Sequence, residues 1–305
     1  MSGPTGPDPV LFLGLGAMGT PMATLLAGAG HDLLLRDVDE ERARDLADRI
    51  GARAVGAAQV AEEAAAVRTV VLMLPDSAAV EAVLLGEGGL LALLTAGSTV
   101  VDMSSSRPAS TVALAAAAGE RGIAYVDAPV SGGVARAKDG SLAIMVGGSP
   151  DALAAVRPLL EVMGGDVTHV GEQPGAGHAM KALNNLLSAV GMAAASEVLS
   201  VGANFGLEPQ VMLDVLNRST GRNQATEVKF AKFVLSGAFD SGFGMRLMVK
   251  DLRTALELAH ETGTPVPLAA SCLEEWTAAG RSLPADADHT HIAAYVERRA
   301  GTELR

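Results

Sequence analysis

Two polar side chains, Lys181 and Asn185, stand four residues apart in the apolar run AMKALNNLL. On a helix this spacing places both on one face. Burial lowers the pKa of an ammonium group, and a second cation nearby, for which Lys250 is the candidate, lowers it further. Such a lysine can exchange a proton with a substrate, while Asn185 orients the substrate hydroxyl or the amine. The alternative is a lysine whose stem covers apolar surface and whose head reaches solvent.

A serine and two glycines, Ser131-Gly132-Gly133, follow an expected strand that ends at Asp127. Two glycines let successive backbone N–H groups converge, and such a nest with a hydroxyl can hold a carboxylate without net positive charge. In an acidic chain this is a means of binding an anionic substrate. The alternative is a plain glycine turn.

A glycine-rich turn follows the first expected strand and precedes a helix. In this arrangement the glycines permit a tight turn, close approach of a pyrophosphate and close packing of the helix on the sheet. The helix N-terminus adds N–H groups and a positive dipole end. The pattern predicts a dinucleotide site, formed by Gly14, Leu15, Gly16, Ala17, Met18 and Gly19.

Asp37 follows at about the 20-residue spacing at which an acidic side chain binds the adenosine ribose hydroxyls. Its carboxylate would repel a 2′-phosphate, which favours NAD over NADP. Arg36 beside it could bind that phosphate, so NADP is the alternative, whereas Val38 offers no donor.

Strands and helices that alternate up to about residue 170 would position these residues. Such alternation predicts a parallel sheet with helical crossovers, whose ligands bind beyond the carboxyl ends of the strands. The segments 72–75 and 102–106 reach the same edge, where each could instead be an ordinary turn or a helix cap. The expected strands are Val10–Leu13, Leu33–Leu35, Thr69–Leu74, Thr99–Asp102, Ala124–Asp127, Ala143–Val146 and Val167–Val170.

From Gly177 the pattern becomes helical, with no convincing strand. The first helix, which we expect to end near Gly206, is longer than the average of about 11 to 12 residues, and such length suits a link between domains or subunits. The sequence therefore predicts an α/β protein with a Rossmann-type NAD-binding domain over 1–170. An all-helical substrate and dimerisation domain over 171–305 would begin with the long interdomain helix. Three glycines are expected to separate helices: Gly206, Gly221 and Gly263.

The 305-residue chain has 23 Lys and Arg against 35 Asp and Glu, a net charge of -12. This acidity argues against nucleic acid or an anionic membrane surface as a partner. The single Cys272 excludes an intrachain disulfide framework, has no His or Cys at metal-ligand spacing and is expected to be a buried structural thiol. No metal site is expected.

The segment Met1–Pro9 carries no positive charge and does not resemble a secretory signal. Apolar stretches such as Leu186–Ala195 fall short of the roughly 20 residues that a membrane span needs. We therefore expect a cytoplasmic protein without a transmembrane segment.

Four long motifs occur in the order typical of the β-hydroxyacid dehydrogenase family: FLGLGAMGTPMA, DAPVSGGVARAKDGSLAIMVGG, GAGHAMKALNN and VKDLRTALELA. Over nearly its whole length the chain resembles this family, in particular its 3-hydroxyisobutyrate dehydrogenase and tartronate semialdehyde reductase branches. The resemblance implies that Lys181 is the catalytic acid/base and that Asn185 assists it. It also implies that Ser131, Gly132 and Gly133 hold the substrate carboxylate.

The same resemblance places Lys250 beside the nicotinamide. Two positions depart from the family pattern. Ala79 stands where relatives often carry an asparagine near the cofactor, so that contact is expected to be lost, and Met103 replaces a usual small polar residue. Neither touches the chemistry. The resemblance also assigns three residues to the cofactor site: Leu74, Pro75 and Ser105.

The expected reaction moves a hydride between NAD and the β-hydroxyl-bearing carbon, or the semialdehyde, of a small carboxylic acid such as 3-hydroxyisobutyrate. Three interpretations compete with it. Imine reductases of related fold carry an aspartate or tyrosine at the lysine position, the related 6-phosphogluconate enzyme decarboxylates its oxidised product, and a non-catalytic dinucleotide-binding protein would need no lysine.

The polar segment 218–224 begins the region that closes over the substrate in relatives. Its polarity favours a substrate with a hydroxyl or a second acidic group over the plain methyl of 3-hydroxyisobutyrate, although a solvated interhelical loop would look the same. The small residues of the helical half and its long first helix predict a homodimer or homotetramer.

Overall fold

The computed structural model describes residues 8–305, so most of the segment to which the signal-peptide prediction applies lies outside the described residues. The contacts among residues divide the chain into two compact units. The first ends at Lys181 and the second runs over Ala182–Arg305. Helix α9 (Ala176–Phe205) is continuous across this boundary.

A nine-stranded sheet forms the centre of the first unit, in the order β3-β2-β1-β4-β5-β6-β8-β7 with β9 beside β8. All seven predicted strands are present, although the one predicted over Thr69–Leu74 ends two residues early, at Leu72. Two strands of only two residues, β3 and β7, were not predicted. The strands are β1 (Val10–Leu13), β2 (Leu33–Arg36), β3 (Arg53–Ala54), β4 (Thr69–Leu72), β5 (Thr99–Asp102), β6 (Ala124–Asp127), β7 (Val130–Ser131), β8 (Ala143–Gly147) and β9 (Asp166–Gly171).

The predicted parallel pairing holds from β3 to β6 and is wrong at one end of the sheet. There β8 runs antiparallel to both β6 and β7. Only the segment 132–142 joins β7 to β8, and a parallel connection needs a crossover of about a dozen residues or more. The short connection therefore forces the antiparallel turn.

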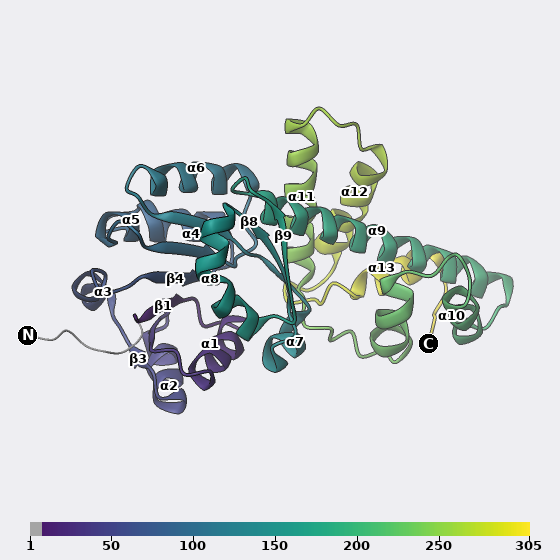
Figure 1. Ribbon diagram of the computed structural model, residues 1–305. Helices are drawn as coiled ribbons and strands as arrows, with labels where there is room; N and C mark the ends of the chain where they lie inside the picture. Colours follow the sequence, from purple (N-terminus) through teal and green to yellow (C-terminus); the bar gives the residue numbers. More distant parts are fainter. Residues whose placement is uncertain (1–7) are drawn as a thin grey trace, which may run out of the picture. The chain divides into compact units, whose positions relative to one another are not determined.

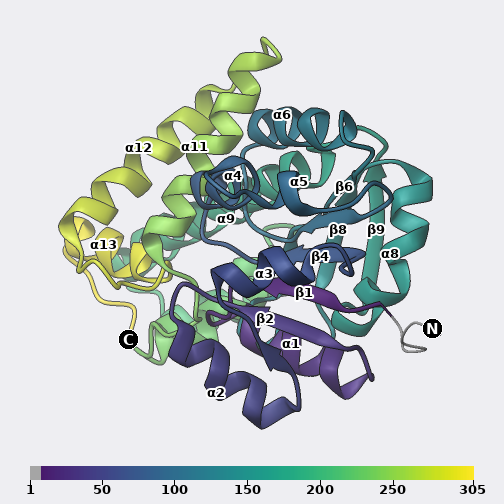
Figure 2. The same ribbon diagram turned by 90° about the vertical axis from the view of Figure 1, so that its left-hand side faces the viewer.

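Helices cover both faces of this sheet (Figures 1 and 2). Alternate side chains of β1 face opposite cores: Val10 and Phe12 belong to one, Leu11 and Leu13 to the other. Because both faces are buried, the central strands are apolar along most of their length, and polar residues such as Arg36, Asp102 and Asp127 stand at their ends. The first core lies under α1 (Gly19–Gly28), α2 (Glu40–Ile50), α7 (Gly133–Asp139) and α8 (Pro150–Met163), and the second under α3 (Ala57–Glu63), α4 (Ser77–Leu85), α5 (Leu90–Leu93) and α6 (Pro108–Gly119).

The second unit is helical, as predicted, and among its described residues the only β-type pairing is an isolated bridge between Gly244 and Asp288. Trp276 lies fully buried in its core and donates a hydrogen bond to the Ala189 carbonyl of α9 (3.3 Å). Besides most of α9, the unit contains α10 (Pro209–Asn217), the π-helix η1 (Ala225–Leu235), α11 (Met245–Glu261), α12 (Pro267–Ser282) and α13 (His291–Ala300).

Two of the three glycines predicted to separate helices follow helix ends directly. Gly206 and Gly263 have φ values of 99° and 65° after α9 and α11. This left-handed conformation favours glycine at a helix C-terminus. Gly221 instead lies inside the connection between α10 and η1, without a positive φ.

Helix α9 is 30 residues long and, by length and apolar composition alone, could cross a membrane, a criterion that a core helix of a folded domain also meets. The expectation that no apolar stretch reaches this length is thus corrected. In the sequence, single polar residues such as Asn185 and Ser196 interrupt the apolar stretches of this helix. Both residues are buried in the structure.

The single cysteine, Cys272, is buried in the helical core, as predicted. Burial raises the pKa of its thiol to about 11. The thiol is therefore protonated at neutral pH and is not a nucleophile.

Candidate active site

The glycine-rich turn connects β1 to α1. It lies at the point where β1 and β4 are neighbours and the order of strands along the sheet reverses. A Cβ on Gly14 would overlap the Met73 carbonyl, and one on Gly19 would overlap the Gly14 carbonyl. A Cβ on Gly16 would meet no heavy atom within 4 Å. The fold itself therefore requires Gly14 and Gly19, whereas Gly16 keeps open the space through which a pyrophosphate approaches the backbone. The turn fits a dinucleotide.

Asp37 packs against this turn. Its carboxylate accepts hydrogen bonds from the backbone N–H groups of Leu15 (2.6 Å) and Asp39 (2.9 Å), and its side chain is 6% exposed. Arg42, which was not among the predicted site residues, lies 3.2 Å from Asp37 and 3.1 Å from Asp39. Because two carboxylates neutralise Arg42, this arginine offers little attraction to a 2′-phosphate.

The ends of β4 and β5 are joined by side chains. The Leu74 N–H donates to Ser104 Oγ (3.0 Å), and the Ser104 N–H donates to the Asp102 carboxylate (3.0 Å). The predicted cofactor residues Leu74, Pro75 and Ser105 thus lie at neighbouring strand ends, Pro75 exposed and Ser105 partly buried.

The two positions that depart from the family pattern have structural partners. Ala79 donates its N–H to Asp76, which caps the start of α4 (3.0 Å). Met103 is 1% exposed and belongs to the core of the sheet. Neither position offers a polar side chain to a ligand.

Sequence reasoning missed a buried polar cluster behind these strand ends. Its centre is His178, in the first turn of α9, whose ring nitrogens each lie 3.8 Å from a carboxylate, one of Asp102 and one of Asp127. The Nε2 atom is 3.0 Å from the Ser104 carbonyl, which can only accept, so Nε2 carries a proton. The Nδ1 atom lies 2.7 Å from Thr111 Oγ1.

Asp127 fixes the backbone of the same turn. It accepts hydrogen bonds from the N–H groups of Gly175 (2.8 Å) and His178 (2.9 Å). The start of α9 is therefore anchored to β6 three residues before Lys181. The sequence signal was a histidine in the GAGHAMK segment together with aspartates that end two neighbouring strands.

Ser131 ends β7, opposite Ala143 of β8, and the following glycines open α7. Gly132 and Gly133 have φ values of 134° and 69°, and both are exposed. A Cβ on Gly132 would also lie 2.6 Å from Cδ of Arg136. Only glycine fits this succession, and its backbone is open to a ligand.

In the second unit a chain of polar contacts joins α9 to α11. Buried Asn185 donates to the Asp251 carboxylate (2.6 Å), which also lies 3.2 Å from the Lys250 ammonium. Asn185 and Lys250 are predicted site residues. Asp251, which contacts both side chains, was not predicted.

Lys181 is partly buried and precedes Asn185 by one turn of the continuous helix α9. Helical periodicity therefore places the two side chains on the same face. Lys181 is the last residue of the first unit and Asn185 lies in the second.

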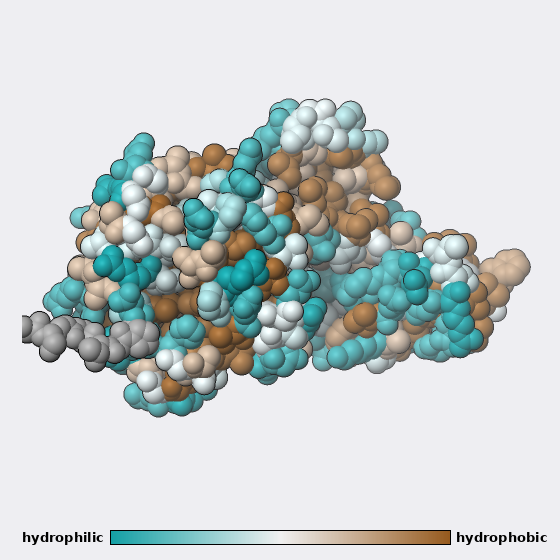
Figure 3. All heavy atoms as spheres, viewed as in Figure 1, coloured by the Kyte–Doolittle hydropathy of each residue, from teal (hydrophilic) through white to brown (hydrophobic). Residues whose placement is uncertain are grey.

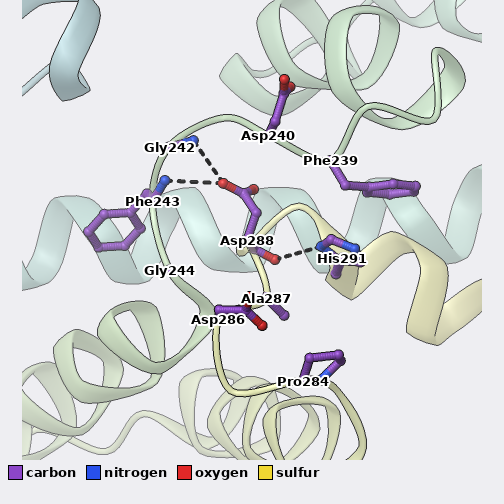
Figure 4. Close-up of a pocket in the computed structure, with 10 residues that line it drawn as sticks. All are labelled: Phe239, Asp240, Gly242, Phe243, Gly244, Pro284, Asp286, Ala287, Asp288 and His291. Atoms are coloured by element: carbon purple, nitrogen blue, oxygen red, sulfur yellow. Dashed lines mark hydrogen bonds between the residues drawn. The ribbon is translucent and has the colours of Figure 1, made fainter.

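A hollow of about 530 Å³ in the second unit is formed by the segments before α11 and α13 (Figure 4). Asp288 closes these segments together, since it accepts hydrogen bonds from the N–H groups of Gly242 (2.8 Å), Phe243 (3.1 Å) and Thr290 (2.9 Å). Burial opposes ionisation of Asp288, but these and side-chain hydrogen bonds from His289 and Thr290 together hold its pKa well below the usual range. None of the predicted site residues lines the hollow.

Across residues 8–305 no group of three or more His, Cys, Asp or Glu side chains is arranged to hold a metal ion.

Comparisons with known proteins cover both units. A family model described as the NAD binding domain of 6-phosphogluconate dehydrogenase matches residues 9–171. A second, described as the NAD-binding domain of NADP-dependent 3-hydroxyisobutyrate dehydrogenase, matches residues 175–296.

Individual relatives match along most of their length. The chain is 44% identical to 2-(hydroxymethyl)glutarate dehydrogenase of Eubacterium barkeri, over 85% of each chain. It is 40% identical to the NAD-dependent L-serine dehydrogenase of Pseudomonas aeruginosa, over 87% of this chain and 89% of the relative. The solved structure of Mycobacterium tuberculosis 3-hydroxyisobutyrate dehydrogenase with L-serine has a TM-score of 0.86 and 31% identity, and covers 95% of this chain and 99% of its own.

Proposed function

Because the chain belongs to the β-hydroxyacid dehydrogenase family, we propose that it is an NAD-dependent dehydrogenase of small 3-hydroxy carboxylic acids. The observation that carries the proposal is the placement of Lys181 and Asn185 on one face of α9, directly after its anchored first turn. The substrates in the relatives' names support the class, since 2-(hydroxymethyl)glutarate, L-serine and 3-hydroxyisobutyrate all carry a hydroxyl on the carbon next to C2.

A dinucleotide held at the glycine-rich turn would supply the hydride acceptor for the carbon that bears the substrate hydroxyl. Lys181, as a neutral amine, removes the hydroxyl proton. The electron pair of the O–H bond becomes the second bond of the carbonyl group as the C–H bond breaks, and the product is a semialdehyde. In the reverse direction the Lys181 ammonium returns the proton to the oxygen.

The other residues orient the substrate. Asn185, held by Asp251, donates or accepts a hydrogen bond at the reacting hydroxyl or at the Lys181 amine. Ser131 and the open backbone of Gly132 and Gly133 bind the carboxylate without a cation, as a nest of N–H groups does.

We assign NAD as the preferred cofactor, with NADP as the alternative. The Asp37 carboxylate suits the ribose hydroxyls, and the salt bridges of Arg42 with Asp37 and Asp39 leave this arginine poorly suited to a phosphate. Leu74, Pro75, Ser105 and Lys250 complete the proposed cofactor contacts.

The protein is proposed to act in the cytoplasm as a homodimer or homotetramer. Exposed apolar side chains on α9 and α10 support self-association, among them Val201 (70% exposed) and Phe205 (83% exposed).

The test is the absorbance of NADH in a panel of short 3-hydroxy acids, their semialdehydes and matched 2-hydroxy acids. We expect turnover of 3-hydroxy acids with NAD and none of 2-hydroxy acids. Absence of turnover with every 3-hydroxy acid and semialdehyde, with either dinucleotide, would refute the proposal. Trapping of CO₂ during turnover would instead favour oxidative decarboxylation.

A further inference from the structure

One face of α9 carries two further polar side chains beyond Lys181 and Asn185, namely Asn184 and Ser188. Ser188 follows Asn185 by three residues, so Lys181, Asn185 and Ser188 form one stripe along the helix. At a rise of about 1.5 Å per residue, Ser188 stands roughly 10 Å along the helix axis from Lys181. A ligand whose hydroxyl meets Lys181 can therefore reach Ser188 only with a group several bonds away.

The π-helix η1 supplies a cation to the far end of this stripe. The Lys229 ammonium donates to Ser188 Oγ (3.1 Å), and both side chains are partly buried. π-Helical turns occur frequently at functional sites because they displace side chains from the ordinary helical register. The helical unit thus presents a positive charge on the face that carries Asn185.

The titratable group beside Lys229 is His289, and it does not add to this positive charge. Burial lowers the pKa of His289, its hydrogen bond with Asp288 opposes that effect, and the Lys229 ammonium adds to the lowering. His289 is therefore neutral at pH 7, and of the two side chains Lys229 carries the charge.

The segment 218–224, whose polarity predicted a substrate with a hydroxyl or a second acidic group, makes hydrogen bonds and ion pairs of its own. Asn223 accepts hydrogen bonds from the N–H groups of Ala225 (2.9 Å) and Thr226 (3.2 Å) at the start of η1. Arg222 lies 3.7 Å from Glu227. Lys229 on η1 contacts Ser188 of the polar stripe, and it is therefore the cation that we consider for a second acidic group of the substrate.

We propose that Lys229 binds a second carboxylate of the substrate, so that the enzyme prefers 3-hydroxy acids with two carboxylates to those with one. This inference rests on the proposed function. In a chain with a net charge of -12, a doubly negative substrate is repelled unless a local cation compensates. The separation of Ser188 from Lys181 requires a spacer of several bonds between the hydroxyl-bearing carbon and the second carboxylate.

The test uses two acids that share one reacting end. 3-Hydroxyisobutyrate carries a methyl group where 2-(hydroxymethyl)glutarate carries a carboxyethyl group, and the half-amide of the second acid keeps its length without the charge. We expect wild-type kcat/KM to be higher for the diacid than for the other two by a factor of about 10 to 100, the range of a charge-assisted contact of about 1.5 to 3 kcal/mol.

The Lys229→Met variant should lower the ratio of diacid to monoacid kcat/KM by a similar factor, and Lys229→Arg should restore part of it. Lys232→Met, which removes an exposed lysine of the same helix, should leave the ratio unchanged. Dinucleotide binding measured by fluorescence verifies that each variant is folded.

The outcomes distinguish the role of Lys229 from the proposed dehydrogenase function. Turnover of the monoacid without preference for the diacid, or an unchanged ratio in Lys229→Met, would overturn the role of Lys229 and leave the dehydrogenase intact. Absence of turnover of all three acids would overturn the role of Lys229, and it would overturn the dehydrogenase function as well if every other 3-hydroxy acid and semialdehyde of the panel also gave no turnover.

Discussion

Several aspartates of this acidic chain accept hydrogen bonds that join segments distant in the sequence. Asp37 binds the glycine-rich turn, Asp127 the start of α9 and Asp251 the side chain of Asn185. A carboxylate with two acceptor oxygens can satisfy several N–H groups at once. At the residue scale, buried negative charge therefore positions the site residues.

Asp288 offers a test of this role away from the site. Replacement of Asp288 by Asn should lower the free energy of unfolding by about 1 to 3 kcal/mol at pH 7, because backbone donors of the 242–243 segment lose a charged acceptor. Urea denaturation of both proteins measures this difference.

The pH dependence has a definite sign. The folded pKa of Asp288 lies below its unfolded value of about 3.9. Its contribution is thus fully present above about pH 5 and is lost as the pH falls through the folded pKa. The wild-type advantage over Asp288→Asn should shrink below about pH 4, and a constant or growing advantage there would contradict the assignment.

Residue types alone indicated part of the site. Lys181 and Asn185 were recognisable because polar side chains are unusual in an apolar helix. His178, Lys229 and Asp251 were missed because each depends on a partner elsewhere in the chain, and spacing contains no information on such a partner. Asp251 follows a predicted site lysine, yet its contact lies on α9.

At the scale of elements, two glycines of the turn between β1 and α1 are needed for different reasons, one for the fold and one for the ligand. Gly19→Ala places a methyl group against the Gly14 carbonyl and should lower the melting temperature by several degrees. Gly16→Ala adds a methyl group in open space and should leave the melting temperature within about two degrees, while it weakens NAD binding by about tenfold or more.

Calorimetry and titration with NADH, followed by its fluorescence, provide the measurements on both variants. If Gly16→Ala bound NAD as tightly as the wild type, the turn would not be where the pyrophosphate approaches. If Gly19→Ala were fully stable, the predicted overlap with the backbone would be wrong.

The elements that the sequence predicted best are long or strongly apolar. The strands β1, β5 and β6 have the predicted bounds, and α9 begins and ends within about a residue of its glycine signals. β3 and β7 consist of two residues each, too few for a period to appear. The reversal of β8 was missed because strand direction depends on the length of the connection rather than on strand composition.

At the scale of the whole molecule, exposed apolar surface remains on the second unit. Figure 3 shows apolar atoms over α11 and α12 and at the end where α9 meets α10. The exposed side chains of the latter region are Val198, Val201, Phe205, Val211 and Val215. Contiguous apolar surface of this kind marks interaction sites.

Self-association through this surface is expected. Wild-type protein should sediment as a dimer or tetramer, and a Val201→Glu, Phe205→Glu double variant should dissociate to a smaller species, since charges would be buried in the interface. Leu85→Glu, which alters an exposed leucine of α4, is the matched control and should leave the mass unchanged. A monomeric wild type in analytical ultracentrifugation would contradict the proposal.

The central claim is that Lys181 moves the proton of the substrate hydroxyl. Its most direct test is the kcat of Lys181→Ala for oxidation of a 3-hydroxy acid at saturating NAD, beside the Kd of NAD and the exposed-lysine control Lys232→Ala. We expect kcat to fall by on the order of 10² to 10⁴-fold, with NAD binding within about twofold of wild type and the control unaffected. A Lys181→Ala variant whose kcat stays within about threefold of wild type would contradict the claim.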